Sequence, residues 1–382
     1  MNPIAYAHDN RESALEQLKE FLSIPSVSTL REHQPDMQRA ARWLQARLEE
    51  AGLENVQILP TGGHPVIYAD WLHAGDAPTV LLYGHYDVQP PDPLELWHTD
   101  PFTPVVRDGK LYARGSADDK GQLFLQIAAL EALIRAEDRL PVNVKCLFEG
   151  EEEIGSEHLD PWIEQNQARL AADVAVISDS HVLSAEQPSI VYGLRGLAYI
   201  EAYVESARGD LHSGAYGGAI HNPVQALCEI IAQLHDESGR VAVPGFYDDV
   251  LPLEDAERAE MARVPYDEQT LLEETGATRA WGEPGYTVLE RISARPTLEI
   301  NGFWGGFAGE GAKTVLPARA GAKISMRLVA NQEPWEIARL VGDHIKSLAP
   351  PTVRVEVKEL HHGEAAIVPR DIPAMEAASA AY

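Results

Sequence analysis

The 382-residue sequence contains few cysteines and few basic residues, and each shortage excludes a class of protein. Cys146 and Cys228 are the only cysteines, and because they form no Cys-x-x-Cys unit, we expect two small buried side chains rather than a disulfide or a metal site. Lysine and arginine together number 31 against 59 aspartates and glutamates, so the net charge is −28. Such an acidic surface repels phosphate backbones, which excludes nucleic acid and favours a small molecule or a peptide as the partner.

Long apolar runs are absent as well. No run of about 18 or more apolar residues occurs, and the first residues have neither the basic start nor the apolar segment of a secretory signal. We therefore expect a cytoplasmic protein that makes no use of a membrane. The Gly-x-Ser-x-Gly motif of serine hydrolases and the His-Glu-x-x-His motif of zinc peptidases are also missing. The length and the 45% hydrophobic content are sufficient for two domains, each with its own core.

Polar side chains follow four predicted strands, at the points where the strands end. They are His85 and Asp87 after residues 80–84, Asp118 and Asp119 after residues 110–114, Glu152 and Glu153 after residues 142–148, and Asp179 after residues 174–177. A single acidic residue after a strand is usually a turn former or a helix cap. Four such strand ends meeting at one edge of an α/β sheet would instead combine an imidazole with several carboxylates. This is the ligand set of a hard or borderline divalent cation.

Strand and helix patterns alternate in the first half of the chain, which indicates an α/β domain with a mostly parallel sheet flanked by helices. The pattern changes near Tyr192. Beyond it, the expected elements are strands at 197–205, 297–303, 321–329 and 352–357, and helices from Pro223 and over 334–348. Their order is β-α-β-β-α-β, which is typical of a ferredoxin-like α+β module. We expect this module to be inserted after the last metal-bearing strand, with an irregular acidic excursion over 245–292.

These motifs resemble those of a known family. His85-x-Asp87, the loop Ser116-Ala-Asp118-Asp119-Lys-Gly121, Glu152-Glu153 before Ile-Gly-Ser156, and Ser178-Asp179 are similar to the co-catalytic di-zinc peptidases that include carnosinase, aminoacylase, carboxypeptidase G and succinyl-diaminopimelate desuccinylase. The segments at 84–90, 210–214, 311–317 and 325–328 resemble the cytosolic dipeptidase and carnosinase branch most closely. The resemblance covers most of the chain.

The resemblance implies two divalent metal ions per subunit, with zinc expected first and manganese or cobalt as alternatives. Asp118 would bridge both metals, His85 and Asp179 would complete the first site, and Glu153 would serve the second. Glu152 would act as the general base toward a metal-bridged hydroxide, and Asp87 would orient the imidazole of His85. The peptide bond between Asp118 and Asp119 would be cis.

The resemblance also assigns roles to the inserted module, which would be a lid and dimerisation domain. His212 would reach into the partner subunit's site and stabilise the developing oxyanion, Arg327 would bind the free carboxylate of the substrate, and Thr314 would lie nearby. Taken alone, each of these three would be an ordinary surface or strand residue. The implied partners are a short peptide substrate and a second copy of the chain.

The implied domains are a catalytic metal-binding domain over 1–194, the inserted lid and dimerisation domain over 195–362, and an incomplete return to the catalytic domain over 363–382. The family continues beyond this point into a late histidine of the second metal site, so we expect a truncated chain whose second site is incomplete. The expected reaction is hydrolysis of the amide bond of dipeptides or short peptides. Two alternatives stay open: a deacylase or desuccinylase of N-acyl amino acids, and an impaired chain that acts only as a dimeric scaffold.

Overall fold

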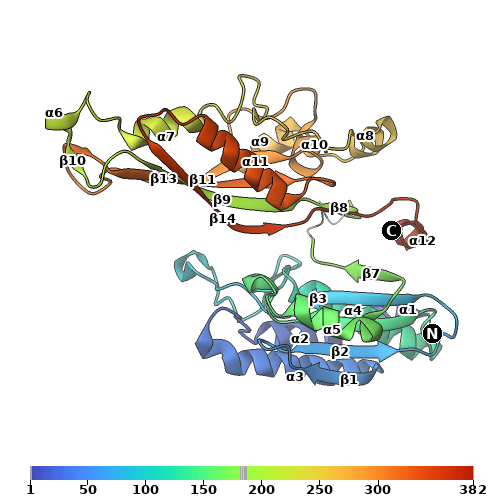
Figure 1. Ribbon diagram of the computed structural model, residues 1–382. Helices are drawn as coiled ribbons and strands as arrows, with labels where there is room; N and C mark the ends of the chain where they lie inside the picture. Colours follow the sequence, from blue (N-terminus) through green and yellow to red (C-terminus); the bar gives the residue numbers. More distant parts are fainter. Residues whose placement is uncertain (1, 181, 183, 185–186, 382) are drawn as a thin grey trace. The chain divides into compact units, whose positions relative to one another are not determined.

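The computed structural model describes residues 2–180, 182, 184 and 187–381. The chain divides into two compact units, Met1–Ser189 and Ile190–Tyr382, each of which has its own sheet (Figure 1). This boundary lies a few residues before the expected one at 194, and residues 363–382 group with the second unit. Their assignment to the catalytic domain stays a prediction. Among the described residues, no helix is long and apolar enough to cross a membrane.

The first unit is built around a five-stranded sheet in the order β1-β2-β6-β3-β7. Its strands are β1 (Glu54–Leu59), β2 (Val66–Trp71), β3 (Thr79–His85), β6 (Asn143–Glu149) and β7 (Val174–Ile177). β3 pairs in parallel with β6 and with β7, whereas β2 pairs antiparallel with β1 and with β6. The expected mostly parallel sheet is therefore wrong, and the sheet is mixed. A short link between β1 and β2 favours an antiparallel pair, because parallel neighbours need a long crossover.

Helices cover both faces of this sheet. They are α1 (Pro3–Asp9), α2 (Arg11–Leu22), α3 (Gln34–Ala51), α4 (Lys120–Glu137) and α5 (Leu159–Leu170). On one face, Leu44 of α3 and Leu123 of α4 pack with Ile67 of β2, and all three are fully buried. On the other face, Trp162 of α5 packs with Tyr68 of β2. Because successive side chains of a strand point to opposite faces, β2, which is buried at every position, has apolar residues on both faces, and Asp70 is its one charged residue.

A separate hairpin precedes the loop that carries Asp118. Strands β4 (Val105–Arg107) and β5 (Lys110–Tyr112) form a two-stranded sheet of their own. The expectation that this segment ends in the main sheet is therefore wrong. The loop that carries Asp118 leads directly into α4, which begins after Asp119. The first unit also contains the short 3-10 helices η1 (Arg31–His33), η2 (Leu94–Leu96) and η3 (Glu152–Ile154).

The second unit has a four-stranded antiparallel sheet in the order β11-β13-β9-β14. The strands are β9 (Gly196–Glu205), β11 (Thr297–Gly305), β13 (Arg319–Leu328) and β14 (Arg354–Gly363), and the helices α7 (Pro223–Ile231) and α11 (Pro334–Ser347) cover one face (Figure 1). Ile200 of β9, Leu227 of α7 and Val341 of α11 meet in the core of this unit. The element order is the predicted β-α-β-β-α-β. Cys228 lies on the exposed side of α7, so the expectation of burial is wrong for Cys228 and right for Cys146.

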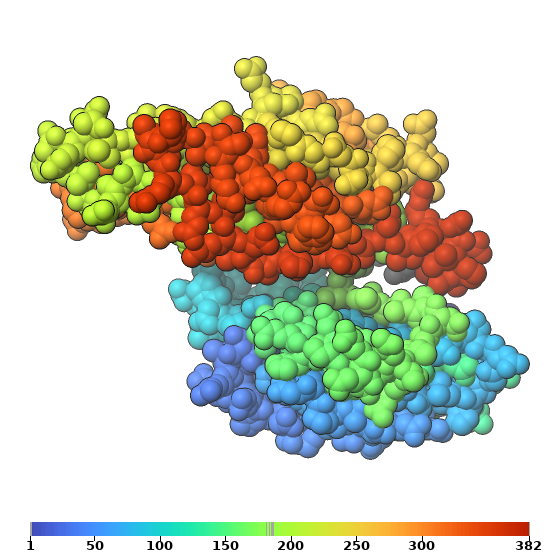
Figure 2. Space-filling view, in the orientation of Figure 1, coloured from blue at the N-terminus to red at the C-terminus, as the bar shows by residue number. Residues whose placement is uncertain are grey.

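The remaining elements of the second unit are short. They are β8 (Gly193–Leu194), β10 (Leu211–His212), α6 (Ser213–Tyr216), α8 (Asp255–Met261), α9 (Glu268–Thr275), α10 (Val288–Ser293), β12 (Val315–Leu316), β15 (Ala366–Ile367) and α12 (Pro373–Ala381). The excursion over 245–292, expected to be irregular, thus contains the three helices α8, α9 and α10. The α6 and β10 segment lies at one end of this unit, where it projects in the space-filling view (Figure 2).

Candidate metal centre

The strands of the first unit bring the predicted ligands to one sheet edge. β6, β3 and β7 run in parallel, so their carboxyl ends lie side by side. β3 ends in His85 itself, the turn after β6 carries Glu152 and Glu153, and Asp179 follows β7 by two residues. Asp118 arrives at the same edge from the loop before α4. The prediction that separate segments of the chain converge on one imidazole is therefore confirmed.

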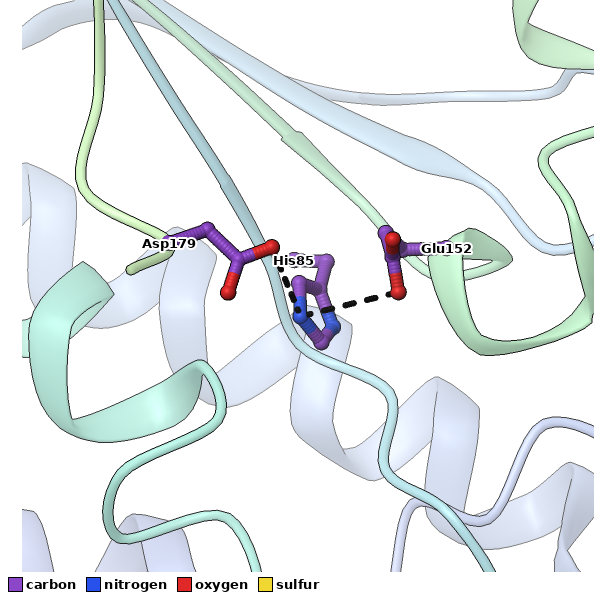
Figure 3. Close-up of side chains that lie close together, drawn as sticks. All are labelled: His85, Glu152 and Asp179. Atoms are coloured by element: carbon purple, nitrogen blue, oxygen red, sulfur yellow. Dashed lines mark ion pairs between the residues drawn. The ribbon is translucent and has the colours of Figure 1, made fainter. Parts of the chain in front are cut away.

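The Nε2 atom of His85 faces three carboxylates. It lies 3.1 Å from Asp118 Oδ1, 3.7 Å from Asp179 Oδ2 and 3.9 Å from Glu152 Oε2. Figure 3 shows the His85 ring between Asp179 and Glu152, with both carboxylates directed toward it. His85 is completely buried, whereas Asp118 is exposed, so one side of the cluster is open to solvent.

Asp87 lies at the other ring nitrogen of His85. Nδ1 is 3.1 Å from the backbone oxygen of Asp87 and 3.4 Å from its carboxylate Oδ1. The second carboxylate oxygen, Oδ2, accepts a hydrogen bond of 3.1 Å from the backbone N–H of Glu153. Asp87 is fully buried. One buried side chain thus connects the imidazole to the turn that carries Glu152 and Glu153, and its role in orienting the ring stays a prediction.

The donor atoms form two overlapping groups that could each hold a cation. One consists of His85, Glu152 and Asp179, and the other of His85, Asp118 and Glu153, with the ligand atoms of each group within 4.8 Å of one another. Gln89 Nε2 donates to Glu153 Oε2 at 2.8 Å. Nitrogen and carboxylate oxygen donors suit zinc and similar divalent ions. Glu152 was expected to be a general base and not a metal ligand. Its carboxylate lies close enough to the other donor atoms to serve as either.

The carboxylates around His85 have raised pKa values. Burial is the main cause that raises the pKa of Glu152 to about 7; His85 opposes the shift, and the neighbouring carboxylates add to it. Burial also raises the pKa of Glu153 and of Asp179. For His85, burial lowers the pKa, but the hydrogen bond with Asp87 and the surrounding negative charges outweigh it and raise the pKa to about 10. A cation at this place would replace protons, so the site fits a divalent metal.

Sequence reasoning missed the part that Asp119 plays. Its side chain is fully buried, its Oδ2 accepts the backbone N–H of His85 at 3.1 Å, and burial raises its pKa to about 7. Gly84 permits this approach, because a Cβ atom there would lie 2.8 Å from Asp119 Oδ2. The peptide bond between Asp118 and Asp119 is cis, as the resemblance implied. The one sequence signal for the contact between Asp119 and the backbone of His85 is that Asp119 stands next to Asp118.

The residues predicted in the inserted module lie in the second unit. Thr314 Oγ1 is 3.3 Å from His212 Nε2, and the backbone N–H of Gly214 donates to His212 Nδ1 at 3.0 Å. The structure thus brings His212 and Thr314 together. Arg327 lies near the end of β13 and is exposed. Burial, together with the like charge of Arg327, lowers the pKa of Arg195, a second guanidinium that sequence reasoning did not single out.

A buried imidazole among carboxylates at the carboxyl edge of an α/β sheet is the arrangement of a divalent-metal enzyme. Known proteins agree with this class. The model of peptidase family M20/M25/M40 matches residues 81–382. The Cys-Gly metallodipeptidase dug1 of Schizosaccharomyces pombe is 35% identical over 349 residues, which cover 88% of this chain and 73% of that protein. The Beta-Ala-His dipeptidase of Homo sapiens is 36% identical over 298 residues, or 76% of this chain and 59% of that protein.

A solved structure agrees over nearly the whole chain. The crystal structure of human carnosine dipeptidase 1 superposes with a TM-score of 0.80 at 30% identity, and the match covers 99% of this chain and 83% of that one. The chain belongs to peptidase family M20/M25/M40, and it is a metallopeptidase.

Proposed function

We propose that this protein hydrolyses the amide bond of dipeptides or other short peptides with two divalent metal ions, zinc first among them. The observation that carries the proposal is the buried imidazole of His85, whose Nε2 faces carboxylates from three segments of the chain. The similarity to the Cys-Gly and Beta-Ala-His dipeptidases supports dipeptides as the substrate class. The exposed Asp118 supports access of a substrate from solvent.

The protein groups have distinct tasks in such a reaction. His85, Asp118, Glu153 and Asp179 would hold the metals, which supply a Lewis acid for the scissile carbonyl and lower the pKa of water. Glu152, with a pKa raised to about 7, is suited to accept a proton from the attacking water near neutral pH. The same carboxylic acid then donates that proton to the nitrogen of the leaving amine. The Asp87 carboxylate keeps the imidazole in one orientation.

We further propose that the second unit is an inserted lid through which two copies of the chain form a dimer. Within one unit, the His212 and Thr314 pair lies before the start of β13, whereas Arg327 lies near its end. Arg327 follows Arg319, the first residue of β13, by eight positions, which corresponds to about 26 Å of extended strand. So large a separation supports two different active sites for the two groups, with His212 serving the partner subunit and Arg327 its own.

The test compares the Glu152→Gln variant with the wild type and with Glu157→Gln, an exposed glutamate five positions further along the chain. Glu152→Gln should lower turnover by about 10²–10⁴ with unchanged metal content, because the amide cannot take the proton. Glu157→Gln should keep wild-type turnover. A panel of dipeptides and N-acyl amino acids identifies the substrate class, and turnover of N-acyl amino acids alone would replace the dipeptidase proposal with a deacylase. Absence of turnover in the wild type with intact dimers would favour the scaffold.

A further inference from the structure

Three side chains outside the metal centre meet directly behind the turn that carries Glu152 and Glu153. The Tyr83 hydroxyl donates to Glu149 Oε1 at 2.5 Å, and the Ser156 hydroxyl donates to the same oxygen at 3.0 Å. Glu149 is only 2% exposed. A single carboxylate oxygen thus joins three segments: β3 through Tyr83, the end of β6 through Glu149, and the end of the turn through Ser156. We call these three residues the Glu149 brace.

The turn itself has little internal support. Residues 150–156 contain one 3-10 turn, Glu152–Ile154, and then two left-handed residues, Gly155 with φ 92° and Ser156 with φ 51°. Its internal backbone hydrogen bonds run from Gly155 N–H to the Glu152 oxygen at 3.0 Å, and from the N–H groups of Ile154 and Ser156 to the Glu151 oxygen at 3.1 and 2.8 Å. A single 3-10 turn is a weak element, so contacts with its surroundings must decide where its side chains lie.

The brace connects this turn to the strand that supplies the imidazole. β3 and β6 pair in parallel so that His85 stands opposite Glu149, and Tyr83 lies two positions before His85 on the same side of β3. The hydroxyl of Tyr83 therefore holds the Glu149 carboxylate at a fixed place relative to His85. Ser156 then ties the end of the turn to that carboxylate.

We propose that Tyr83, Glu149 and Ser156 are positioning residues that hold Glu152 at its working distance from His85. The inference rests on the proposed function, in which Glu152 transfers the proton. A displacement of about 1 Å at a catalytic group is enough to reduce turnover strongly, whereas substrate affinity depends on other contacts. Loss of a brace hydrogen bond should therefore lower kcat and leave KM and metal content unchanged.

Two variants each remove one hydrogen bond of the brace. Tyr83→Phe removes the phenol, and Ser156→Gly removes the hydroxyl while keeping a residue that accepts a positive φ. Each should lower kcat about tenfold with KM within about twofold of the wild type. The matched control is Tyr68→Phe, because the Tyr68 hydroxyl also donates to a carboxylate, Asp70 Oδ2 at 2.9 Å, but on β2. Tyr68→Phe should keep kcat within about twofold.

The conservative variant Glu149→Gln provides a rescue. Its amide oxygen can accept from both hydroxyls, so kcat should stay within about threefold of the wild type, whereas Glu149→Leu, which has no acceptor, should fall at least as far as Tyr83→Phe. If Glu149→Leu does not fold, the Tyr83→Phe and Ser156→Gly pair still decides the question.

Hydrogen exchange gives a readout that does not depend on catalysis. In Tyr83→Phe and Ser156→Gly the amides of residues 150–156 should exchange faster than in the wild type, while those of residues 66–71 should not change. Unchanged exchange at 150–156 overturns the brace, and faster exchange with wild-type kcat overturns its positioning role. If the wild type cleaves no peptide at all, the proposed function fails, and the exchange data alone decide whether the brace holds the turn.

Discussion

Binding of zinc to the metal-free protein should release about two protons per chain at pH 7 and about one at pH 8.5. Three groups at the site hold protons before a metal binds: His85 with a pKa of about 10, and Glu152 and Asp119 with pKa values of about 7. At pH 7 the imidazole is fully protonated and each carboxyl is about half protonated, which amounts to about two protons. At pH 8.5 only the imidazole proton remains. Coordinating or neighbouring a divalent cation requires the deprotonated form of each group.

The assay is calorimetric titration of zinc in two buffers of equal pH whose ionisation enthalpies differ, since the difference in heat gives the number of protons released. Glu152→Gln should release about half a proton less at pH 7 and the same number at pH 8.5, because only the carboxyl contribution is removed. His73→Ala, which removes an exposed histidine paired with Glu54, should behave as the wild type. A release near zero at pH 7, or one that does not fall toward pH 8.5, would refute the reasoning.

Four further expectations follow from the same structure. The buried carboxyls of the folded metal-free protein have raised pKa values, so the folded protein binds more protons than the unfolded chain between about pH 4 and pH 7. Its stability therefore falls as the pH rises through this window. Zinc should raise the melting temperature more at pH 8 than at pH 6 in a thermal-shift assay. Asp118→Ala should abolish binding of both metals, as measured by metal analysis of the purified variant. Mixing His212→Ala with Glu152→Gln subunits should restore turnover above that of either parent, and no gain would place the site within one chain. Leu123→Ala, at a fully buried position of α4, should lower the free energy of unfolding by about 2–5 kcal/mol in denaturant titration, whereas Leu125→Ala, at a residue 64% exposed, should change it by less than about 0.5 kcal/mol.

The convergence of the ligands could be predicted because it depends on local signals. His85 ends one short apolar strand and Asp179 follows another, and strand ends of a parallel group meet at one edge. Antiparallel pairing of β2 with β6 could not be predicted, because periodicity shows which face of a strand is buried but not which strand lies beside it. Cys228 shows a related limit. The predicted helix is present, but its buried side consists of residues such as Ala226, Leu227 and Ile230, and Cys228 lies outside it.

The supporting contacts of the site were invisible in the sequence for another reason. The Asp119 carboxylate approaches the backbone of His85, and the hydroxyls of Tyr83 and Ser156 meet at Glu149. Each of these contacts joins segments that are distant along the chain, and each depends on side-chain directions that appear only when the sheet is assembled. A single sequence gives the residue types but does not show which side chains will be in contact.

The parallel pairing of β3 with β6 and β7 also affects the order of events during folding. Each parallel pair can form only after its crossover segment, with α4 or α5, has closed a long loop, and such non-local contacts form slowly. His85 and Asp179 therefore become neighbours only after both crossovers are complete, so a metal ion cannot nucleate this domain. Once captured, the ion stabilises contacts that are absent from an early transition state, and its main kinetic effect is to slow unfolding. Metal supply would then set how long the folded molecule lasts and have little influence on how fast it first forms.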